Sequence, residues 1–210
     1  VNFQTKRGLD QSMVKLDAGR FNTLRTVGLF NLLNDRNQNA YIATEYLYSD
    51  GPFESPQNFD RINIMGKYTA GLKDGSTLSL MASHFTSEWD ASGQIPDRAV
   101  ESGQITRFGA LDDTEGGNTS RTNVALDYTK VLNERTFVRN HVYYSQYDFE
   151  LYSNFTFFLL DSINGDQIRQ REDRSIFGVE SQLISFIPLG SVEANLQFAV
   201  GLRNDRIKDS

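Results

Sequence analysis

Three arginines and two aromatic residues in one long polar segment have the types and spacing needed to bind an anion. The five residues are Trp89, Arg98, Arg107, Phe108 and Arg121. A guanidinium group pairs with oxyanions and stacks on aromatic faces, so the set suits an anionic chelate. The alternative is that these arginines pair with acidic residues of the same segment and only fold the loop; the acidic residues are Asp97, Glu101 and Asp112.

The same segment carries an acidic cluster made of Asp112, Asp113 and Glu115. Carboxylate oxygens are the ligands that Ca²⁺ prefers, so this cluster is a candidate metal site. The alternative is a loop whose carboxylates are solvated. Nothing in the spacing of the three residues decides between the two interpretations.

Catalytic chemistry has little support in the sequence. There are two histidines, His84 and His141, each inside a segment with strand character, and there is no cysteine. The sequence contains no H-E-x-x-H, no G-x-S-x-G and no phosphate-binding loop. We therefore expect the chain not to be an enzyme and expect no cofactor.

The elements that must position these residues are strands, as the segment Gly190–Arg203 illustrates. Its side chains alternate between apolar and polar after Gly190, and a period of two residues predicts a strand with two different faces. The segment runs for about a dozen residues, roughly twice the usual ~5–6 of a soluble strand. Its apolar residues are Val192, Ala194, Leu196, Phe198, Val200 and Leu202.

Similar segments occur along the whole chain, and we predict nine strands and no helix. The predicted strands are Ser12–Gly19, Asn22–Leu33, Asn39–Asp50, Asn58–Gly71, Ser76–Glu88, Arg121–Val131, Arg135–Leu151, Ser175–Ile187 and Gly190–Arg203. Tyrosines near strand ends are typical of the aromatic girdle of a membrane barrel. We assign to it Tyr46, Tyr48, Tyr68, Tyr128, Tyr143 and Tyr147. We expect the polar face to line a wet interior, with Glu180, Gln182, Glu193, Asn195 and Gln197.

Long and short connections alternate along the chain from the third strand onward. The long ones are residues 51–57, 89–120 and 152–170, and tight turns with Gly, Asp or Pro lie between them. In an up-and-down sheet all the short turns then fall at one end and all the long loops at the other. Outer-membrane barrels show this asymmetry, with long loops outside the cell. A soluble sandwich of two sheets is the alternative, but strands and loops of these lengths argue against it.

The composition of the chain argues against further classes of protein. The chain has 210 residues and a formal net charge of −6, which argues against nonspecific nucleic-acid binding. No run approaches the ~18 apolar residues of a membrane-spanning helix. The chain starts at Val1 and stops at Ser210, just after a strand, so we expect it to be a fragment.

Several short stretches, in order, resemble TonB-dependent outer-membrane receptors. VNFQTKRG at residues 1–8 is similar to the end of the plug domain of that family. WDASGQIPDRAVESGQITRFGALDDTEGGNTSR at 89–121 and SNFTFFLLDSINGDQIRQRE at 153–172 are similar to loop sequences in one branch of it. The resemblance implies that residues 1–9 close a plug and that residues 10–210 form the first part of a transmembrane antiparallel up-and-down β-barrel. Nine strands would be part of the wall of a large plugged barrel.

The resemblance also implies a function and partners. It implies active uptake of a scarce nutrient across the bacterial outer membrane, most of all a ferric siderophore or other metal chelate. The implied partners are the TonB complex, through a TonB box lying before Val1, the small-molecule ligand and outer-membrane lipid, with no nucleic acid. Cobalamin, sugars and other nutrients stay open as ligands, as do a passive porin-like channel and a soluble all-β binding module.

Overall fold

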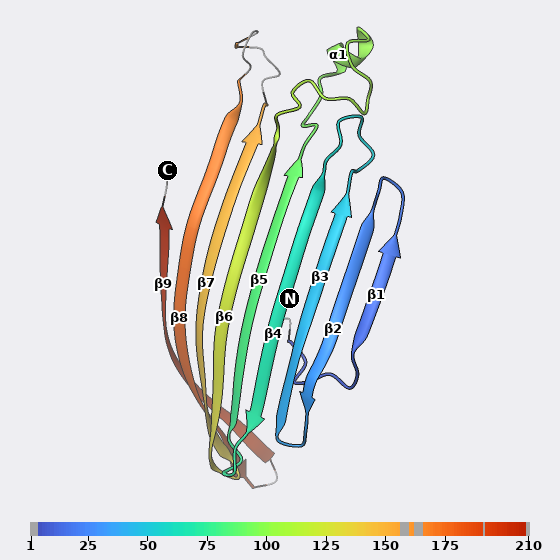
Figure 1. The fold of residues 1–210 in the computed structure, drawn as a ribbon. Coiled ribbons are helices and arrows are strands. Elements are labelled where there is room, and N and C mark those ends of the chain that lie inside the picture. The colour runs from blue at the N-terminus through green and yellow to red at the C-terminus, as the bar shows by residue number, and fades with distance from the viewer. Residues whose placement is uncertain (1–3, 156–159, 162–165, 191, 209–210) are drawn as a thin grey trace.

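Nine strands form a single antiparallel sheet in strict chain order in the computed structural model (Figure 1). The structure describes residues 4–155, 160–161, 166–190 and 192–208. This all-β, up-and-down order is the one predicted from the sequence. The strands are β1 (Met13–Ala18), β2 (Leu24–Asn34), β3 (Gln38–Ser49), β4 (Phe59–Gly71), β5 (Thr77–Asp90), β6 (Gly116–Asn133), β7 (Thr136–Ser153), β8 (Ile168–Leu189) and β9 (Val192–Lys208).

Two strands begin earlier than predicted. β6 begins at Gly116 and β8 at Ile168, where the sequence lacks clear alternation. Backbone pairing extends them: Gly117 lies opposite Trp89 of β5, and β8 pairs with β7 from Ile168 onward. Ladder hydrogen bonds therefore override the weak local pattern, and the long connections shrink to residues 91–115 and 154–167.

A short helix, α1 (Asp97–Glu101), lies in the longest connection and was not predicted. It has five residues and follows Pro96, which occupies the N-cap position in an extended conformation. No helix in the described part of the chain is long and apolar enough to cross a membrane.

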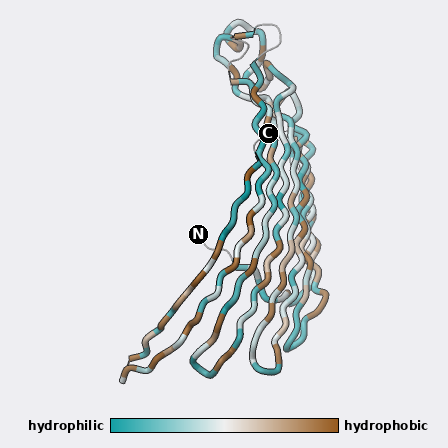
Figure 2. The backbone as a smooth tube through the Cα atoms, turned by 90° about the vertical axis from the view of Figure 1, so that its left-hand side faces the viewer, coloured by the Kyte–Doolittle hydropathy of each residue, from teal (hydrophilic) through white to brown (hydrophobic). Residues whose placement is uncertain are grey.

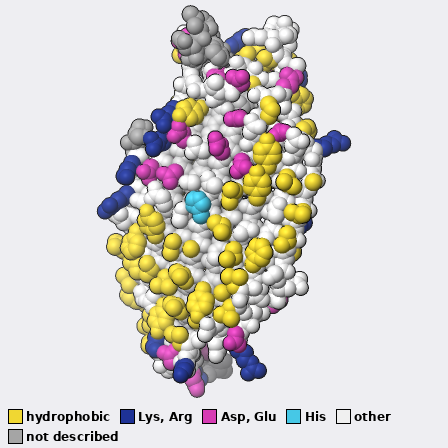
Figure 3. Space-filling model, in the orientation of Figure 1, with side chains coloured by type: hydrophobic (Ala, Val, Ile, Leu, Met, Phe, Trp, Pro, Cys, Tyr) yellow, Lys and Arg dark blue, Asp and Glu magenta, His cyan; other side chains and the backbone are white. Residues whose placement is uncertain are grey.

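The register sorts the side chains of the sheet onto two faces, which we call the apolar face and the polar face. Residues directly opposite each other on neighbouring strands share a face. Large apolar side chains cover much of the face that Figure 3 shows, and many are exposed. On the apolar face these exposed residues include Leu16, Phe30, Ile62, Ile64, Leu80, Val124, Leu126, Phe177, Val179, Leu183, Leu196, Phe198, Val200 and Leu202.

No second layer covers the apolar face in the described residues, and the edge-on view of Figure 2 shows one layer of strands. Leu196 and Phe198 are 56% and 67% exposed. A soluble sandwich would bury these two side chains against a second sheet. The described residues therefore do not form the two packed sheets of the sandwich alternative.

The six tyrosines assigned to a girdle do not share a face. Tyr46, Tyr48, Tyr68 and Tyr128 lie on the apolar face, as predicted, opposite residues such as Ile62 and Leu80. The other two are on the polar face, where the register sets them opposite Gly178 and Arg174, so their assignment to the girdle was wrong; they are Tyr143 and Tyr147. The predicted polar-face residues share this face, namely Glu180, Gln182, Glu193, Asn195 and Gln197.

From β3 onward the long connections gather at one end of the sheet, which we call the loop end, and the tight turns lie at the other, the turn end (Figure 1). The short β1–β2 connection also lies at the loop end, where the Asp50 N–H donates to the carbonyl of Phe21. Gly75 and Gly190 have φ values of 79° and 64° in their turns, a conformation that favours glycine. The predicted alternation of long and short connections is therefore confirmed by the strand order.

Candidate functional site

The predicted anion-binding residues fall into two groups in the structure. Trp89 and Arg121 lie on the polar face near the loop end, on the paired strands β5 and β6. Arg98 lies in α1, and Arg107 and Phe108 lie in the connection that follows it. The structure therefore brings only Trp89 and Arg121 to the same part of the sheet.

Trp89 lines a hollow of about 380 Å³ on the polar face. Its indole lies over Gly117 of the next strand, where a Cβ atom would stand 3.0 Å from Trp89 Cζ2. The missing side chain at Gly117 thus lets the indole lie against the sheet. The hollow is lined by Gln57, Phe59, Arg61, Phe85, Ser87, Trp89 and Thr119, a set of three aromatic rings around one cation.

Arg121 lies beside this hollow, opposite Phe85 in the register. Its guanidinium carbon is 4.8 Å from the centre of the Tyr147 ring, and Tyr147 stacks on Phe149 at 6.4 Å between ring centres. Arg121 makes no ion pair within the described residues, so the alternative in which an acidic residue neutralises it does not hold there. The positive charge of Arg121 therefore lies over the Tyr147 ring.

Arg61 is the polar-face residue that the sequence analysis missed. Its guanidinium carbon lies 6.0 Å from the centre of the Phe59 ring, and its Nη2 donates to Glu45 at 3.1 Å. Its Nε is buried and has no partner among the described residues. The alternation of Phe59, Arg61 and Asn63 at the loop end of β4 was the signal that could have identified it.

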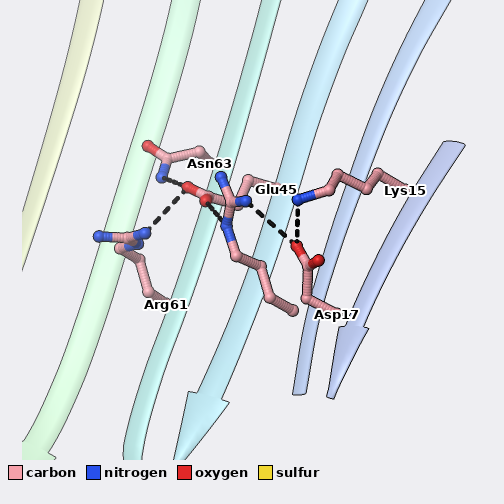
Figure 4. A network of polar contacts seen from close by, with 6 residues as sticks. Lys15, Asp17, Glu45, Arg61 and Asn63 are labelled. Atoms are coloured by element: carbon pink, nitrogen blue, oxygen red, sulfur yellow. Dashed lines mark hydrogen bonds and ion pairs between the residues drawn. The ribbon is translucent and has the colours of Figure 1, made fainter. Parts of the chain in front are cut away.

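A charged network continues from Arg61 across four strands toward β1 (Figure 4). The carboxylate of Glu45 accepts hydrogen bonds from Arg25 Nε at 2.6 Å, Asn63 Nδ2 at 3.0 Å and Arg61 Nη2. Asp17 is paired with Arg25 at 3.4 Å and with Lys15 at 2.9 Å. Three cations face two carboxylates, so the network carries an excess of one positive charge. A second hollow of about 420 Å³ lies over it.

The predicted residues of the longest connection, Arg107 and Phe108, do not line this hollow, and Phe108 contacts another loop. Phe108 packs against Phe53, with 6.4 Å between ring centres, and its carbonyl accepts the Glu54 N–H at 2.9 Å. Thr106 Oγ1 donates to Glu54 Oε1 at 2.6 Å. These contacts tie connection 91–115 to connection 50–58. Arg107, between Thr106 and Phe108, makes no ion pair within the described residues.

The predicted acidic cluster forms a junction between the two longest connections. Asn154, which is buried, donates from Nδ2 to Asp112 Oδ2 at 3.1 Å, and Gln167 Nε2 donates to Thr114 Oγ1 at 2.8 Å. Burial alone would raise the pKa of Asp112, but hydrogen bonds from Thr114 and Asn154 hold it below its usual value. Burial raises the pKa of Glu115, which is only 7% exposed.

Asp112, Asp113 and Glu115 were a candidate cation site in the sequence, with a solvated loop as the alternative, and that site stays a prediction. Among the described residues, no group of three or more His, Asp or Glu side chains is arranged to hold a metal ion. The oxygens of Asp112 already accept hydrogen bonds within the junction.

The two histidines lie on opposite faces of the sheet. His84 Nδ1 is 2.9 Å from Thr122 Oγ1 on the apolar face. His141 Nδ1 is 2.7 Å from Asp127 Oδ1 on the polar face, and its ring stacks on Tyr143 at 5.3 Å. They therefore cannot act together in one catalytic site.

The N-terminal segment lies against the polar face. Lys67 Nζ donates to Thr5 Oγ1 at 2.7 Å, and the Tyr41 hydroxyl donates to the carbonyl of Lys6 at 3.2 Å. Residues 1–3 of the predicted plug end lie outside the described residues. The chain thus reaches β1 from the side of the sheet that carries the hollows.

Solved structures of siderophore receptors have the same fold over nearly the whole chain. The siderophore receptor PiuA from Acinetobacter baumannii matches with a TM-score of 0.76 and 12% identity, over 97% of this chain and 32% of that protein. The ferric-catecholate import receptor Fiu from E. coli K12 matches in its open form with a TM-score of 0.71 and 15% identity, over 96% of this chain and 35% of that one. The closed form matches with a TM-score of 0.70.

This likeness concerns the fold, since the identities are low. No family model and no curated protein matches the sequence. The chain spans about a third of the length of the receptors it matches, with 32% and 35% of their chains covered. Its nine strands therefore have the arrangement of one section of the barrel wall of such receptors.

Proposed function

We propose that the chain belongs to a TonB-dependent outer-membrane receptor, as a section of its barrel wall. In this arrangement the apolar face contacts lipid, the polar face lines the lumen and the loop end lies outside the cell. The exposed apolar face and the one-sided distribution of long loops support it. The N-terminal segment on the polar face fits a plug that precedes β1 inside the barrel.

The function we propose is TonB-dependent uptake of an anionic metal chelate with aromatic groups, such as a ferric siderophore. The observation that carries it is a hollow walled by Phe59, Phe85 and Trp89 with the cation of Arg61 in its lining. The Arg61 side chain is 30% exposed, so its guanidinium group offers positive charge to an anionic ligand in the hollow.

The residues have separate roles in this proposal. Trp89, Phe59 and Phe85 offer faces on which planar aromatic groups of a chelate stack. Arg61 in the lining of the hollow and Arg121, held over Tyr147, supply positive charge. No bond is made or broken in the ligand. The energy for release into the periplasm would come from the TonB complex acting on the plug.

The loops provide the outer part of the binding region. Contacts from Phe53 and Glu54 to Thr106 and Phe108, and from Asn154 to Asp112, join the three long connections to one another. Arg98 and Arg107 are then candidates for first contact with the ligand, above the hollow, and their role stays a proposal.

The experiment is uptake of a radiolabelled ferric catecholate by a receptor-deficient strain that expresses the full-length protein. We expect uptake to require TonB and to fall about tenfold in Arg61→Gln and in Trp89→Ala, since each loses roughly 1–2 kcal/mol of ligand interaction. Arg139→Gln, on the polar face of β7 but not in the lining of the hollow, is the matched control. Uptake that persists without TonB would favour a passive channel.

A further inference from the structure

Residues 5–8, which we call the strap, cover a buried part of the polar face. Asn39 and Tyr41 of β3 lie beneath the strap and are only 8% and 4% exposed. Tyr143 and Tyr147, on the same face of the same single-layered sheet, are only half-buried. The strap therefore shields side chains that a bare sheet would leave partly open to solvent.

Two side chains of the sheet hold successive carbonyl groups of the strap. Tyr41 and Lys67 lie opposite each other on β3 and β4. The Tyr41 hydroxyl donates to the carbonyl of Lys6 at 3.2 Å. Lys67 Nζ donates to the carbonyl of Thr5 at 3.4 Å and to Thr5 Oγ1 at 2.7 Å. Because two of these acceptors are backbone atoms, the attachment fixes the path of the main chain and not only one side chain.

The C-terminal half of the strap follows the sheet closely. A Cβ atom at Gly8 would stand 2.5 Å from Asn39 Oδ1 and 3.0 Å from Asn39 Cβ, so β3 occupies the space that a side chain would need. Glycine is suited to such a close approach of two backbones. The guanidinium group of Arg7 lies near Gly71, where a Cβ atom would stand 3.6 Å from Arg7 Nη2. The strap is thus attached along its whole length.

The strand that follows the strap is much less firmly held than the strands that the strap contacts. β1 has six residues, nearly all of them exposed, and it pairs with one strand, β2, among the described residues. β3 and β4 have 12 and 13 residues and a paired strand on each side. Segments with few buried contacts open first. A pull on the chain that reached β1 directly would therefore act on a weak part of the described sheet.

We propose that the strap is a fixed anchor, which stays on β3 and β4 during transport while the part of the full-length protein that precedes Thr5 moves relative to it. The inference rests on the proposed function, in which the TonB complex acts on that preceding part. The anchor passes the pulling force to two long interior strands and keeps it from β1. The hinge of the movement then lies at or before Thr5.

A disulfide between the strap and β3 tests whether the strap must leave the sheet. The chain has no cysteine, and the Cβ separation of 3.0 Å between positions 8 and 39 becomes that of a disulfide, roughly 3.5–4.5 Å, after a small shift. We expect the full-length Gly8→Cys/Asn39→Cys variant to take up a radiolabelled ferric catecholate equally well before and after reduction. Maleimide labelling of the denatured protein measures how much of it is crosslinked.

The outcomes separate the anchor from the proposed function. Loss of uptake in the crosslinked protein, restored by reduction, would overturn the anchor, because the strap would then have to leave β3. The reduced variant is the control for folding. TonB-dependent uptake that is absent from wild type as well would refute the proposed function, and the force measurement that follows tests the anchor without transport.

Pulling the full-length protein by its N-terminus in a lipid bilayer, one molecule at a time, measures the load that the strap bears. We expect wild type to stop extending at Thr5 until a force peak is reached. The Tyr41→Phe/Lys67→Met double variant lacks both side-chain donors, so its peak should fall to lower force. β1 should then be released with the strap, adding up to roughly 50 Å of extension at ~3.3–3.6 Å for each residue.

A matched double variant shows whether the loss is specific to the strap. Tyr128→Phe/Lys73→Met makes the same two changes on the apolar face of β6 and in the β4–β5 turn, and it should behave as wild type. The same force and extension in wild type and in Tyr41→Phe/Lys67→Met would overturn the anchor. An equal fall in force in the matched variant would overturn it too, because the loss would then reflect general weakening of the sheet.

Discussion

The ring of Tyr143 lies over Gly178, the residue opposite it on the neighbouring strand β8. A Cβ atom at Gly178 would stand 2.3 Å from the ring carbons Cε1 and Cζ, far inside any normal contact. Tyr143 also stacks on His141 of its own strand at 5.3 Å between ring centres. An aromatic side chain that covers a glycine in this way protects the exposed backbone and fixes the register of the two strands.

This relationship predicts that Gly178 and Gly66 respond differently to the same substitution. Gly178→Ala should destabilise the folded barrel by about 1–3 kcal/mol, because the Tyr143 ring must leave its position. Gly66→Ala should be neutral or stabilise by up to about 1 kcal/mol, since open space receives the methyl group and the unfolded chain loses freedom. Urea titration of the full-length protein in lipid vesicles measures both. Equal effects at the two positions would contradict the assignment of Tyr143 to Gly178.

The carboxylate of Glu45 should contribute more to the free energy of unfolding than a carboxylate outside the charged network of the polar face. Its side chain is 17% exposed and accepts hydrogen bonds from Arg25, Arg61 and Asn63. Glu45→Gln removes the charge that two guanidinium groups share, and we expect a loss of about 2 kcal/mol in the free energy of unfolding. Glu193→Gln, on the same face of edge strand β9, is the control and should change stability by less than about 0.5 kcal/mol. Equal losses in the two variants would show that the network does not stabilise the sheet.

The loop junction should open as pH rises. Burial raises the pKa of Glu115 above its ordinary 4.5, and the charge of Asp112 adds to the effect. Because the folded pKa is the higher one, the contribution to closure is complete below pH 4.5 and is lost as pH rises through the folded value. Hydrogen exchange at the amides of Ala91 and Asn154 should therefore quicken over that range.

Two variants test this pH dependence. Glu115→Gln keeps the shape but cannot ionise, so exchange at the same amides should lose the pH-dependent opening. Asp113→Asn changes a neighbouring acid that takes no part in the hydrogen bonds of Asp112 with Thr114 and Asn154, and it should behave as wild type. Persistence of the opening in Glu115→Gln would assign it to another group.

The two faces and the two ends of the sheet could be predicted from the sequence, because both depend on local patterns of residues. The period of two in β9 and the alternation of long and tight connections predicted the faces and the ends correctly. The starts of β6 and β8 were missed because pairing with a neighbouring strand, which no local pattern records, extends them. Tyr143 was misplaced for a related reason, since its face depends on which residue lies opposite.

The candidate site depends even more on register. Trp89 and Arg121 were identified from residue type, but Arg61 joins them only because β4 pairs with β5 in a particular alignment. The link from Arg61 through Glu45 to Arg25 crosses three strands. Single-sequence patterns do not give cross-strand partners, so the network was not predicted. Phe108 was chosen for its type, and its contact with Phe53 in another loop could not be read from the sequence.

Trp89 and Arg121 should contribute to ligand affinity in different ways, and the difference can be measured. Trp89→Phe keeps an aromatic face over Gly117, whereas Trp89→Ala removes it, so binding of a ferric catecholate should fall about threefold in the first and about tenfold in the second. Arg121→Lys keeps the charge but not the planar group that stacks on Tyr147, and Arg121→Gln loses both. We expect Arg121→Lys to lie between wild type and Arg121→Gln.

Equilibrium binding of the labelled chelate to the full-length protein in detergent, at low and high salt, separates the two roles. The loss of affinity in Arg121→Gln relative to wild type should be smaller at high salt, because screening weakens the attraction between Arg121 and the chelate in wild type. The loss of affinity in Trp89→Ala should not depend on salt. Arg139→Gln is again the control for charge on the same face. Identical affinities in Trp89→Ala and wild type would show that the hollow is not part of the binding site. The loop residues Arg98 and Arg107 would then be the alternative, because these are the remaining cations of the predicted set.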